Sequence, residues 1–149
     1  MIAYSKSKKK IILVIGGSSS IGRDIIEKFI SNDWQVIATY NSNKILLREN
    51  LVIKKLNLLS PTSLKSFTKY LKNFSKIDYI LFLPSILNGK KLQDYSFKDI
   101  NRCMNVNFNS QVYLLSKILF SISKSGFVLF VSSISGEKGS YDPIYAASK

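Results

Sequence analysis

The 149-residue sequence has no histidine and a single cysteine, Cys103. No intramolecular disulfide can form, and catalysis by histidine and most transition-metal sites are excluded, so we expect no metal site. No stretch approaches the ~20 consecutive apolar residues that a membrane-spanning helix needs. These absences predict a protein of a reducing, cytoplasmic setting with no membrane attachment.

Acidic residues are also few, with 9 Asp and Glu against 22 Lys and Arg, which gives a net charge of +13. Such a charge raises the possibility of a nucleic acid or another polyanion as partner. Only the first ten residues, 1–10, carry a basic run, formed by Lys6, Lys8, Lys9 and Lys10. The other basic residues are scattered, so we expect a solvated lysine-rich surface and no specific nucleic-acid partner. A polyanion site at Lys6–Lys10 stays as a weaker hypothesis.

The hydrophobic content of 46% is that of a globular protein, and the length is enough for one domain, 1–149, that buries roughly 70% of its unfolded surface. Ile11–Ile15 is a short β-rich run, typical of a strand buried on both faces. Apolar residues then recur at helical spacing from Ile21 to Ile30, and a second strand is expected at Trp34–Tyr40. A right-handed crossover makes these two strands parallel.

The same alternation continues to the end of the chain. We expect strands at 51–56, 77–83 and 127–131, a helix that begins after Ser60-Pro61, and a long helix over about 98–123. The apolar face of the helix after Pro61 is formed by Leu64, Phe67, Tyr70, Leu71 and Phe74. Alternating strands and helices of this kind predict an α/β fold, a Rossmann-like doubly wound parallel sheet of about five strands.

A glycine- and serine-rich turn lies between the first strand and the first helix. Backbone N–H groups at a helix N-terminus, together with the helix dipole, attract an anion, and small side chains allow a pyrophosphate to approach the backbone. No Gly-Lys-Ser/Thr follows, which excludes a Walker loop. The turn therefore predicts a dinucleotide site, with an ordinary glycine-rich turn as the alternative. Its residues are Gly16, Ser18, Ser19, Ser20, Ile21 and Gly22.

Two residues near the end of the chain, Tyr145 and Lys149, are four positions apart, which places them on one face of a helix. A cation about 4 Å from a phenol favours its ionised form by roughly 4 kcal/mol at an effective dielectric constant near 20. A tyrosine activated in this way can exchange a proton near neutral pH. The pair alone could also be an ordinary surface contact.

Together these segments resemble the short-chain dehydrogenase/reductase family, compact branch. The turn is similar to the family's TGxxxGxG motif, with Ile15 in place of Thr and Ser20 in place of the middle glycine. Tyr145-Ala146-Ala147-Ser148-Lys149 resembles its YxxxK motif and follows a strand that ends in Ser132-Ser133. Asn107 matches the family's helix asparagine.

The resemblance implies an NAD(P)-dependent oxidoreductase that transfers a hydride between nicotinamide and a small-molecule carbonyl or alcohol. Tyr145 would exchange the proton of the substrate oxygen, and Lys149 would assist the phenol and hold the nicotinamide ribose. Ser133, with Ser132 as the alternative, would hydrogen-bond the substrate oxygen. Asn107 would anchor a water molecule in the proton relay.

The resemblance also places the cofactor. The second strand ends in Tyr40-Asn41-Ser42-Asn43-Lys44, without the Asp or Glu that would repel a 2′-phosphate, so NADP(H) is favoured over NAD(H). Asn57 and Leu58 occupy the place where the family meets the adenine. Where the family usually has Asn-Asn-Ala-Gly after the fourth strand, this chain has Phe82-Leu83-Pro84-Ser85, which puts cofactor geometry in question.

Family domains continue beyond the YxxxK lysine with two further strands and a substrate lid. The resemblance therefore predicts that the chain is an N-terminal fragment of a longer enzyme, a domain incomplete at its C-terminus with apolar surface exposed near the fifth strand. Expressed alone, it should aggregate or bind cofactor weakly. The full-length form is expected to be a homo-oligomer. Ile15, Ser20 and the 82–85 segment favour one rival hypothesis, a non-catalytic dinucleotide-binding or sensing module.

Overall fold

The computed structural model describes residues 9–74 and 76–149, and its centre is one five-stranded parallel sheet. The strands lie in the order β3-β2-β1-β4-β5, so the chain moves outward in one direction from β1 and then crosses back to build the other half. This is the doubly wound α/β sheet predicted from the sequence. The strands are β1 (Ile11–Ile15), β2 (Gln35–Tyr40), β3 (Leu51–Lys55), β4 (Ile77–Phe82) and β5 (Ile122–Phe130).

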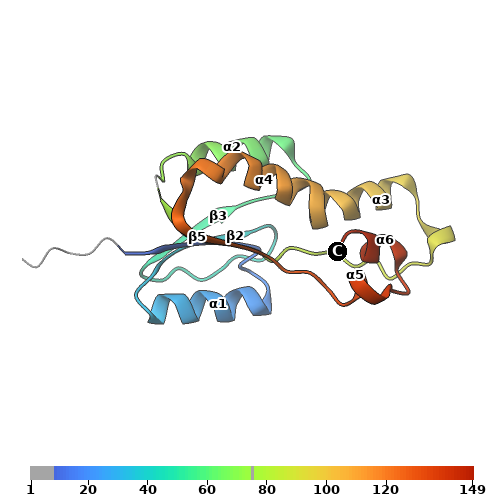
Figure 1. Ribbon diagram of the computed structural model, residues 1–149, viewed down its shortest axis with the longest axis horizontal. Helices are drawn as coiled ribbons and strands as arrows, with labels where there is room; N and C mark the ends of the chain where they lie inside the picture. Colours follow the sequence, from blue (N-terminus) through green and yellow to red (C-terminus); the bar gives the residue numbers. More distant parts are fainter. Residues whose placement is uncertain (1–8, 75) are drawn as a thin grey trace, which may run out of the picture.

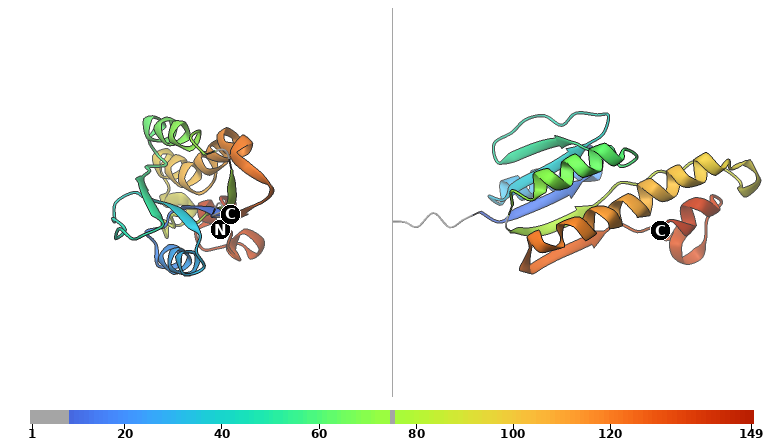
Figure 2. Two further views of the ribbon diagram at one scale, coloured as in Figure 1. Left: turned by 90° about the vertical axis from the view of Figure 1, so that its left-hand side faces the viewer. Right: turned by 90° about the horizontal axis from the view of Figure 1, so that it is seen from above.

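Helices cover both faces of the sheet (Figure 1). Helix α1 (Ser20–Ser31) lies on one face, and α2 (Pro61–Leu71) and α4 (Ser110–Ile118) lie on the other. Helix α3 (Phe97–Met104) and the short helices α5 (Ser135–Lys138) and α6 (Pro143–Ala147) lie beyond the sheet, at the end where the strands finish. The two additional views show the same layers and the extension of α3 past the strands (Figure 2).

The alternation of side chains along β1 explains why the sheet needs helices on both sides. Leu13 and Ile15 belong to the larger core cluster, which also contains Leu64, Phe67 and Leu71 from α2. Ile12 and Val14 point the other way and pack with Ile26 of α1. Because all four of these strand residues are at most 1% exposed, a continuous apolar run is the expected pattern for β1.

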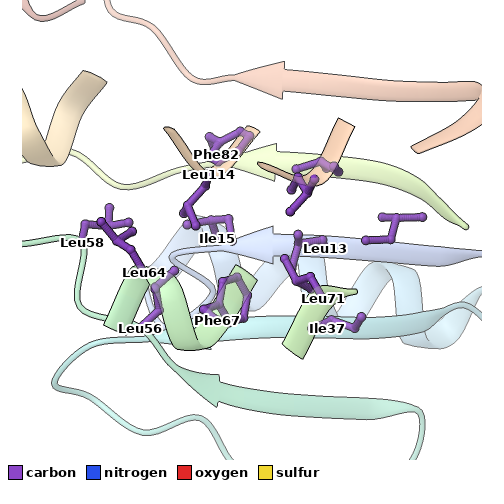
Figure 3. Packing of buried hydrophobic residues seen from close by; sticks show 13 residues of the cluster. Leu13, Ile15, Ile37, Leu56, Leu58, Leu64, Phe67, Leu71, Phe82 and Leu114 are labelled. Atoms are coloured by element: carbon purple, nitrogen blue, oxygen red, sulfur yellow. The ribbon is translucent and has the colours of Figure 1, made fainter. Parts of the chain in front are cut away.

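The larger cluster fills the space between the sheet and the helices α2 and α4 (Figure 3). In this view Leu71 and Phe67 extend from α2 toward β1 and β2, and Leu114 extends from α4 toward Phe82 of β4. Leu71 and Leu114 are both completely buried. The cluster thereby attaches α2 and α4 to the middle of the sheet.

The structure departs from the predicted boundaries in the last third of the described chain. The helix expected over about 98–123 is divided into α3, a π-helical turn at Asn105–Asn109, and α4. After a 3-10 turn at Leu119–Ser121, β5 begins at Ile122, five residues before the predicted start. Apolar periodicity does not separate a π turn from an α-helix, and the Ile-Ser-Lys-Ser start of β5 is too polar to indicate a buried strand.

Two expectations about exposure have opposite outcomes. Ile21 in the first turn of α1 is 60% exposed, so it does not belong to the apolar face that the helical spacing predicts. The apolar surface expected near the fifth strand is present: Phe127, Leu129 and Phe130 of β5 are 40–50% exposed. β5 forms one edge of the sheet, and only β4 pairs with it among the described strands.

The basic run of the sequence lies only partly within the described residues, because Lys6 and Lys8 are outside them. Lys9 forms an ion pair with Asp33 at 2.6 Å and donates to Asn50 at 2.9 Å. The ammonium group of Lys10 lies 5.4 Å from the centre of the Trp34 ring. Both of these lysines are therefore engaged with the fold. Across residues 9–74 and 76–149, no helix has the length and apolar content needed to cross a membrane.

Replacement of Leu71 by Ala tests the main core. Leu71 is fully buried in the larger cluster, so Leu71→Ala should lower the free energy of unfolding by about 2–5 kcal/mol. The matched control is Leu47→Ala, because Leu47 is 84% exposed and its loss should change the free energy by less than about 0.5 kcal/mol. Urea unfolding measures both variants, and equal effects would contradict the described core.

Candidate functional site

A cavity of about 380 Å³ opens at the end of the sheet where the strands finish. Parallel sheets of this type bind ligands at this edge, at the point between β1 and β4 where the strand order reverses. The cavity brings together seven of the predicted cofactor-binding residues, namely Gly16, Ser18, Ser19, Tyr40, Asn41, Asn57 and Leu58. Five other predicted residues do not line it, namely Ser20, Ile21, Gly22, Ser42 and Lys149.

The glycine-rich turn forms one wall of the cavity. Gly16 has a φ of +84°, and a Cβ at this position would lie 3.1 Å from the Pro84 ring. A Cβ at Gly22 would lie 2.7 Å from the Cα of Gly17 and 2.8 Å from the carbonyl oxygen of Gly16. The two glycines at the ends of the motif are therefore required by the backbone conformation and by close packing.

Ser19 caps the helix that follows this turn. Its hydroxyl accepts a hydrogen bond from the Gly22 N–H at 3.0 Å and donates to the Gly16 carbonyl at 3.0 Å. The first N–H groups of a helix have no acceptor within the helix, and those of Ser20 and Ile21 belong to exposed residues. Ser20 is the first residue of α1 and is not among the residues with positive φ, so serine fits where the family motif has glycine.

The end of β2 forms the opposite wall. Tyr40, Asn41 and Asn43 line the cavity, and the Thr39 hydroxyl accepts a hydrogen bond from the Gly16 N–H at 3.0 Å. Thr39 therefore connects the end of β2 to the glycine turn. Lys44 lines a neighbouring hollow of about 250 Å³ together with Arg23 of α1. Lys44 directly follows Asn43, so this basic residue borders the cavity lining along the chain.

Several cavity residues were not predicted from the sequence. Thr39 lies inside an apolar strand, and Arg102 and Val106 come from the segment where α3 meets the π turn. No local motif marks these residues, because the fold brings them to the cavity from distant parts of the chain. The residues Leu83, Pro84 and Ser85 also line it, as the resemblance implied for the segment after the fourth strand.

Asn107 lies in the π turn and is buried, with 6% of its surface exposed. Its side-chain oxygen accepts from the Ile86 N–H at 2.8 Å, and its amide donates to the Ile86 carbonyl at 3.0 Å. The amide also lies 2.8 Å from the Ser148 hydroxyl and 3.4 Å from the Cys103 sulfur. Asn107 thus connects the loop after β4, which lines the cavity, to the residue that precedes Lys149.

Cys103, whose sulfur contacts the Asn107 amide, is buried in the same region. The side chain is fully buried, and burial raises the pKa of the thiol above its ordinary value. The sulfur lies 3.8 Å from both the Ser148 hydroxyl and the Ile86 carbonyl oxygen. Cys103 is therefore a neutral packing residue beneath the site.

Tyr145 belongs to α6, whereas Lys149 lies two residues beyond the last helical residue, Ala147. The ammonium group of Lys149 donates to the Val131 carbonyl at 3.0 Å and lies 5.8 Å from the centre of the Tyr145 ring. The contact with Val131, just past β5, fixes the lysine side chain against the sheet edge. The two residues are thus near each other, although a helix does not include both of them.

The two candidate serines after β5 have different partners. Ser133, which is half-buried, accepts a hydrogen bond from the Ser135 N–H at 3.2 Å within its own turn. Ser132 is exposed and donates to the Lys149 carbonyl at 3.0 Å. Among the described residues, Ser133 forms no hydrogen bond with Lys149. Ser132 is the serine that is hydrogen-bonded to Lys149.

The carboxylate of Asp142 closes the N-terminal end of α6. It accepts from the Tyr145 N–H at 2.9 Å and from the Tyr95 hydroxyl at 2.5 Å. Burial opposes its ionisation, but these hydrogen bonds and those from the backbone of Gly89 and Asn88 hold the pKa of Asp142 below its ordinary value. Burial and the hydrogen bond to Asp142 raise the pKa of Tyr95 to about 12.

The cavity fits a dinucleotide in three respects. Its glycine wall leaves no side chain between a ligand and the backbone at Gly16, and Ser18 and Ser19, which directly precede α1, line the cavity, so the positive end of this helix lies beside it. Asn57 already accepts a hydrogen bond from the Leu59 N–H at 2.9 Å, so its side-chain amide can donate to an adenine edge. Among the described residues, no acidic side chain lines the cavity.

Loss of the Asn107 side chain should destabilise the fold. Asn107→Ala leaves both backbone groups of Ile86 without their side-chain partner, which should cost about 1–3 kcal/mol of unfolding free energy. Asn109→Ala is the control, because Asn109 is exposed and its amide contacts only the Asn105 side chain, so a change under about 0.5 kcal/mol is expected. Thermal or urea unfolding distinguishes them, and a similar loss in both would refute the assignment.

The sequence resembles that of known proteins. A family model described as short chain dehydrogenase matches residues 10–149. The chain is 27% identical to "3-oxoacyl-[acyl-carrier-protein] reductase FabG" of Buchnera aphidicola subsp. Baizongia pistaciae (strain Bp) over 155 residues, which cover 97% of this chain and 63% of that relative. The chain therefore spans less than two thirds of the relative's length.

Solved structures share the fold. A short chain dehydrogenase family protein from Francisella tularensis matches with a TM-score of 0.86 at 22% identity, over 95% of this chain and 58% of that one. A putative short-chain dehydrogenase/reductase from Burkholderia multivorans, solved with bound NADP, matches with a TM-score of 0.78 at 16% identity, over 95% and 68% of the two chains. With the family model covering nearly all of its length, the chain belongs to the short-chain dehydrogenase family, which is an oxidoreductase family.

Proposed function

We propose that this chain carries the cofactor-binding and proton-transfer residues of an NADP(H)-dependent oxidoreductase that interconverts a carbonyl and an alcohol. The observation that carries the proposal is a connected path of contacts from the cavity to the YxxxK residues. Ile86 lines the cavity, Asn107 binds both backbone groups of Ile86, and the same amide contacts Ser148, the neighbour of Lys149. The binding and reacting parts of the site are thereby held in one arrangement.

Each reacting residue has a role that suits its chemistry. The nicotinamide, when bound, supplies or accepts the hydride. The Tyr145 phenol donates its proton to the substrate oxygen as the carbonyl is reduced, and takes the proton back as the alcohol is oxidised. The Lys149 ammonium lies 5.8 Å from the centre of the Tyr145 ring and would hold the nicotinamide ribose beside it. Ser133 positions the substrate oxygen, and Asn107 supports the relay by holding the loop after β4.

The relative with 27% identity suggests a first substrate to test. Its name describes the reduction of a 3-oxoacyl group on an acyl carrier protein. A 3-oxoacyl thioester presents a ketone, which matches the carbonyl substrate that the site requires. We therefore propose 3-oxoacyl thioesters as the first substrates in a carbonyl panel, followed by small ketones and aldehydes. We further propose that the whole protein is a homo-oligomer.

Replacement of Tyr145 by Phe tests the reaction. Because the variant lacks the exchangeable proton, Tyr145→Phe should lower kcat by about 10²–10⁴-fold in NADPH oxidation assays with the carbonyl panel. Tyr141→Phe is the matched control, since Tyr141 is 67% exposed on the loop before α6, and its kcat should stay at the wild-type value.

Three outcomes separate the hypotheses. Activity lost only in Tyr145→Phe supports the oxidoreductase. Equal turnover by wild type and Tyr145→Phe would disprove the assignment of Tyr145. NADPH binding by the wild type without turnover of any carbonyl would instead support the non-catalytic sensing module.

The preference for NADP(H) has its own test at Asn41, which lines the cavity at the end of β2. A carboxylate there would repel a 2′-phosphate and bind the ribose hydroxyls, so Asn41→Asp should weaken NADPH binding by about tenfold or more and leave or improve NADH binding. Asn73→Asp makes the same charge change at an exposed position after α2, away from the residues that line the cavity. Titration calorimetry with both cofactors compares the variants, and equal affinity of the wild type for NADH and NADPH would contradict the preference.

A further inference from the structure

Asp142 is a buried carboxylate without a cationic partner. Asp142 is 1% exposed, and it takes part in none of the ion pairs among the described residues. A buried charge is strongly unfavourable unless hydrogen bonds replace the lost water. Such a group needs several donors, and the structure supplies four.

The four donors come from two parts of the chain. One oxygen accepts from the Tyr145 N–H at 2.9 Å and from the Tyr95 hydroxyl. The other accepts from the Asn88 N–H at 3.1 Å and the Gly89 N–H at 2.8 Å. Three of the donors therefore belong to the segment between β4 and α3, which is 47–54 residues away in the sequence.

The helix that Asp142 caps cannot hold its own geometry. α6 has five residues, Pro143–Ala147, and an isolated helix of this length is unstable in water. Its C-terminal end is held by the Ser148 hydroxyl, which lies 2.8 Å from the amide of Asn107. Its N-terminal end is held by Asp142, and the N–H that Asp142 binds is that of Tyr145 itself.

We infer that Asp142 is a positioning residue for Tyr145: by binding the start of α6 to the 88–95 segment, it fixes where the phenol lies relative to the substrate and the cofactor. The inference rests on the proposed function of Tyr145 in proton transfer. A misplacement of about 1 Å can lower an enzymatic rate about 100-fold, so a small shift of α6 should lower kcat. Asn88, Gly89 and Tyr95 are absent from the lining of the dinucleotide cavity, so Asp142 should affect catalysis more than cofactor binding.

Two substitutions separate the two halves of this contact. Asn is as effective as Asp at a helix N-cap, and in Asp142→Asn the remaining oxygen can still accept from Tyr145 and Tyr95. Its amide nitrogen replaces the second oxygen and cannot accept from the N–H groups of Asn88 and Gly89. Asp142→Ala removes both sets of contacts. Asp94→Asn and Asp94→Ala are the matched controls, because Asp94 lies in the same segment and is exposed.

The first measurement is hydrogen exchange of the purified protein, which does not depend on activity. Asp142→Ala should raise exchange in both 143–149 and 86–91, whereas Asp142→Asn should raise it in 86–91 and leave 143–149 protected. The Asp94 variants should change neither segment. Unchanged exchange of both segments in Asp142→Ala would overturn the inference, even if the protein proved to have no oxidoreductase activity.

The second measurement is the division of the effect between kcat and cofactor binding. Asp142→Ala should lower kcat by about 10- to 100-fold with an unchanged KM for NADPH, and Asp142→Asn should recover part of that loss. Leu71→Ala, destabilised far from the site, is the control for stability alone and should keep its kcat at temperatures where it is folded. If Asp142→Ala retains wild-type kcat, or loses no more than Leu71→Ala, Asp142 is only structural. A wild type that turns over no carbonyl refutes the proposed function instead, and the exchange result then still stands.

Discussion

The Asn107 side chain hydrogen-bonds both backbone groups of Ile86 in the loop after β4. This contact requires Asn107 to face the loop after β4, and it does so from a π turn between α3 and α4. The same amide reaches Ser148, so the position of the loop, the register of the helix and the end of α6 depend on one side chain. A continuous set of hydrogen bonds therefore connects the lining of the cavity to the residue beside Lys149.

The sequence was sufficient for the sheet and for the glycine turn, because both are encoded locally. The apolar run of β1, the Gly16–Gly22 spacing and the periodicity of α2 each depend on neighbouring residues. The parallel order follows from the right-handed crossovers. The same local reasoning gave the wrong start for β5, because the polar residues at 123–125 lie in the register shift between the pairs Ile77–Ile122 and Tyr79–Phe127.

The site was predictable only where a motif is contiguous. The motif spacing predicts Tyr145, Lys149 and the turn residues as site residues, but the contacts that orient them join distant parts of the chain. Thr39 binds Gly16, and Gln111 donates to the Pro84 carbonyl at 2.8 Å. Asp142 and Tyr95 are 47 positions apart. None of these pairs has a spacing that marks it in a single sequence, because each depends on how the elements are packed.

The departures from the family pattern are accommodated by the structure and so favour a binding site that is intact. Ser20 adopts the helical conformation of the first residue of α1, in which a Cβ causes no strain. Pro84 packs against Gly16 at the place where a side chain would otherwise collide, and Gln111 binds its carbonyl. The proline ring therefore packs against the turn from the position where the family pattern has alanine. Because the turn keeps its positive φ at Gly16 and its cap at Ser19, the substitutions alter what borders the cavity and preserve the backbone that a phosphate would contact.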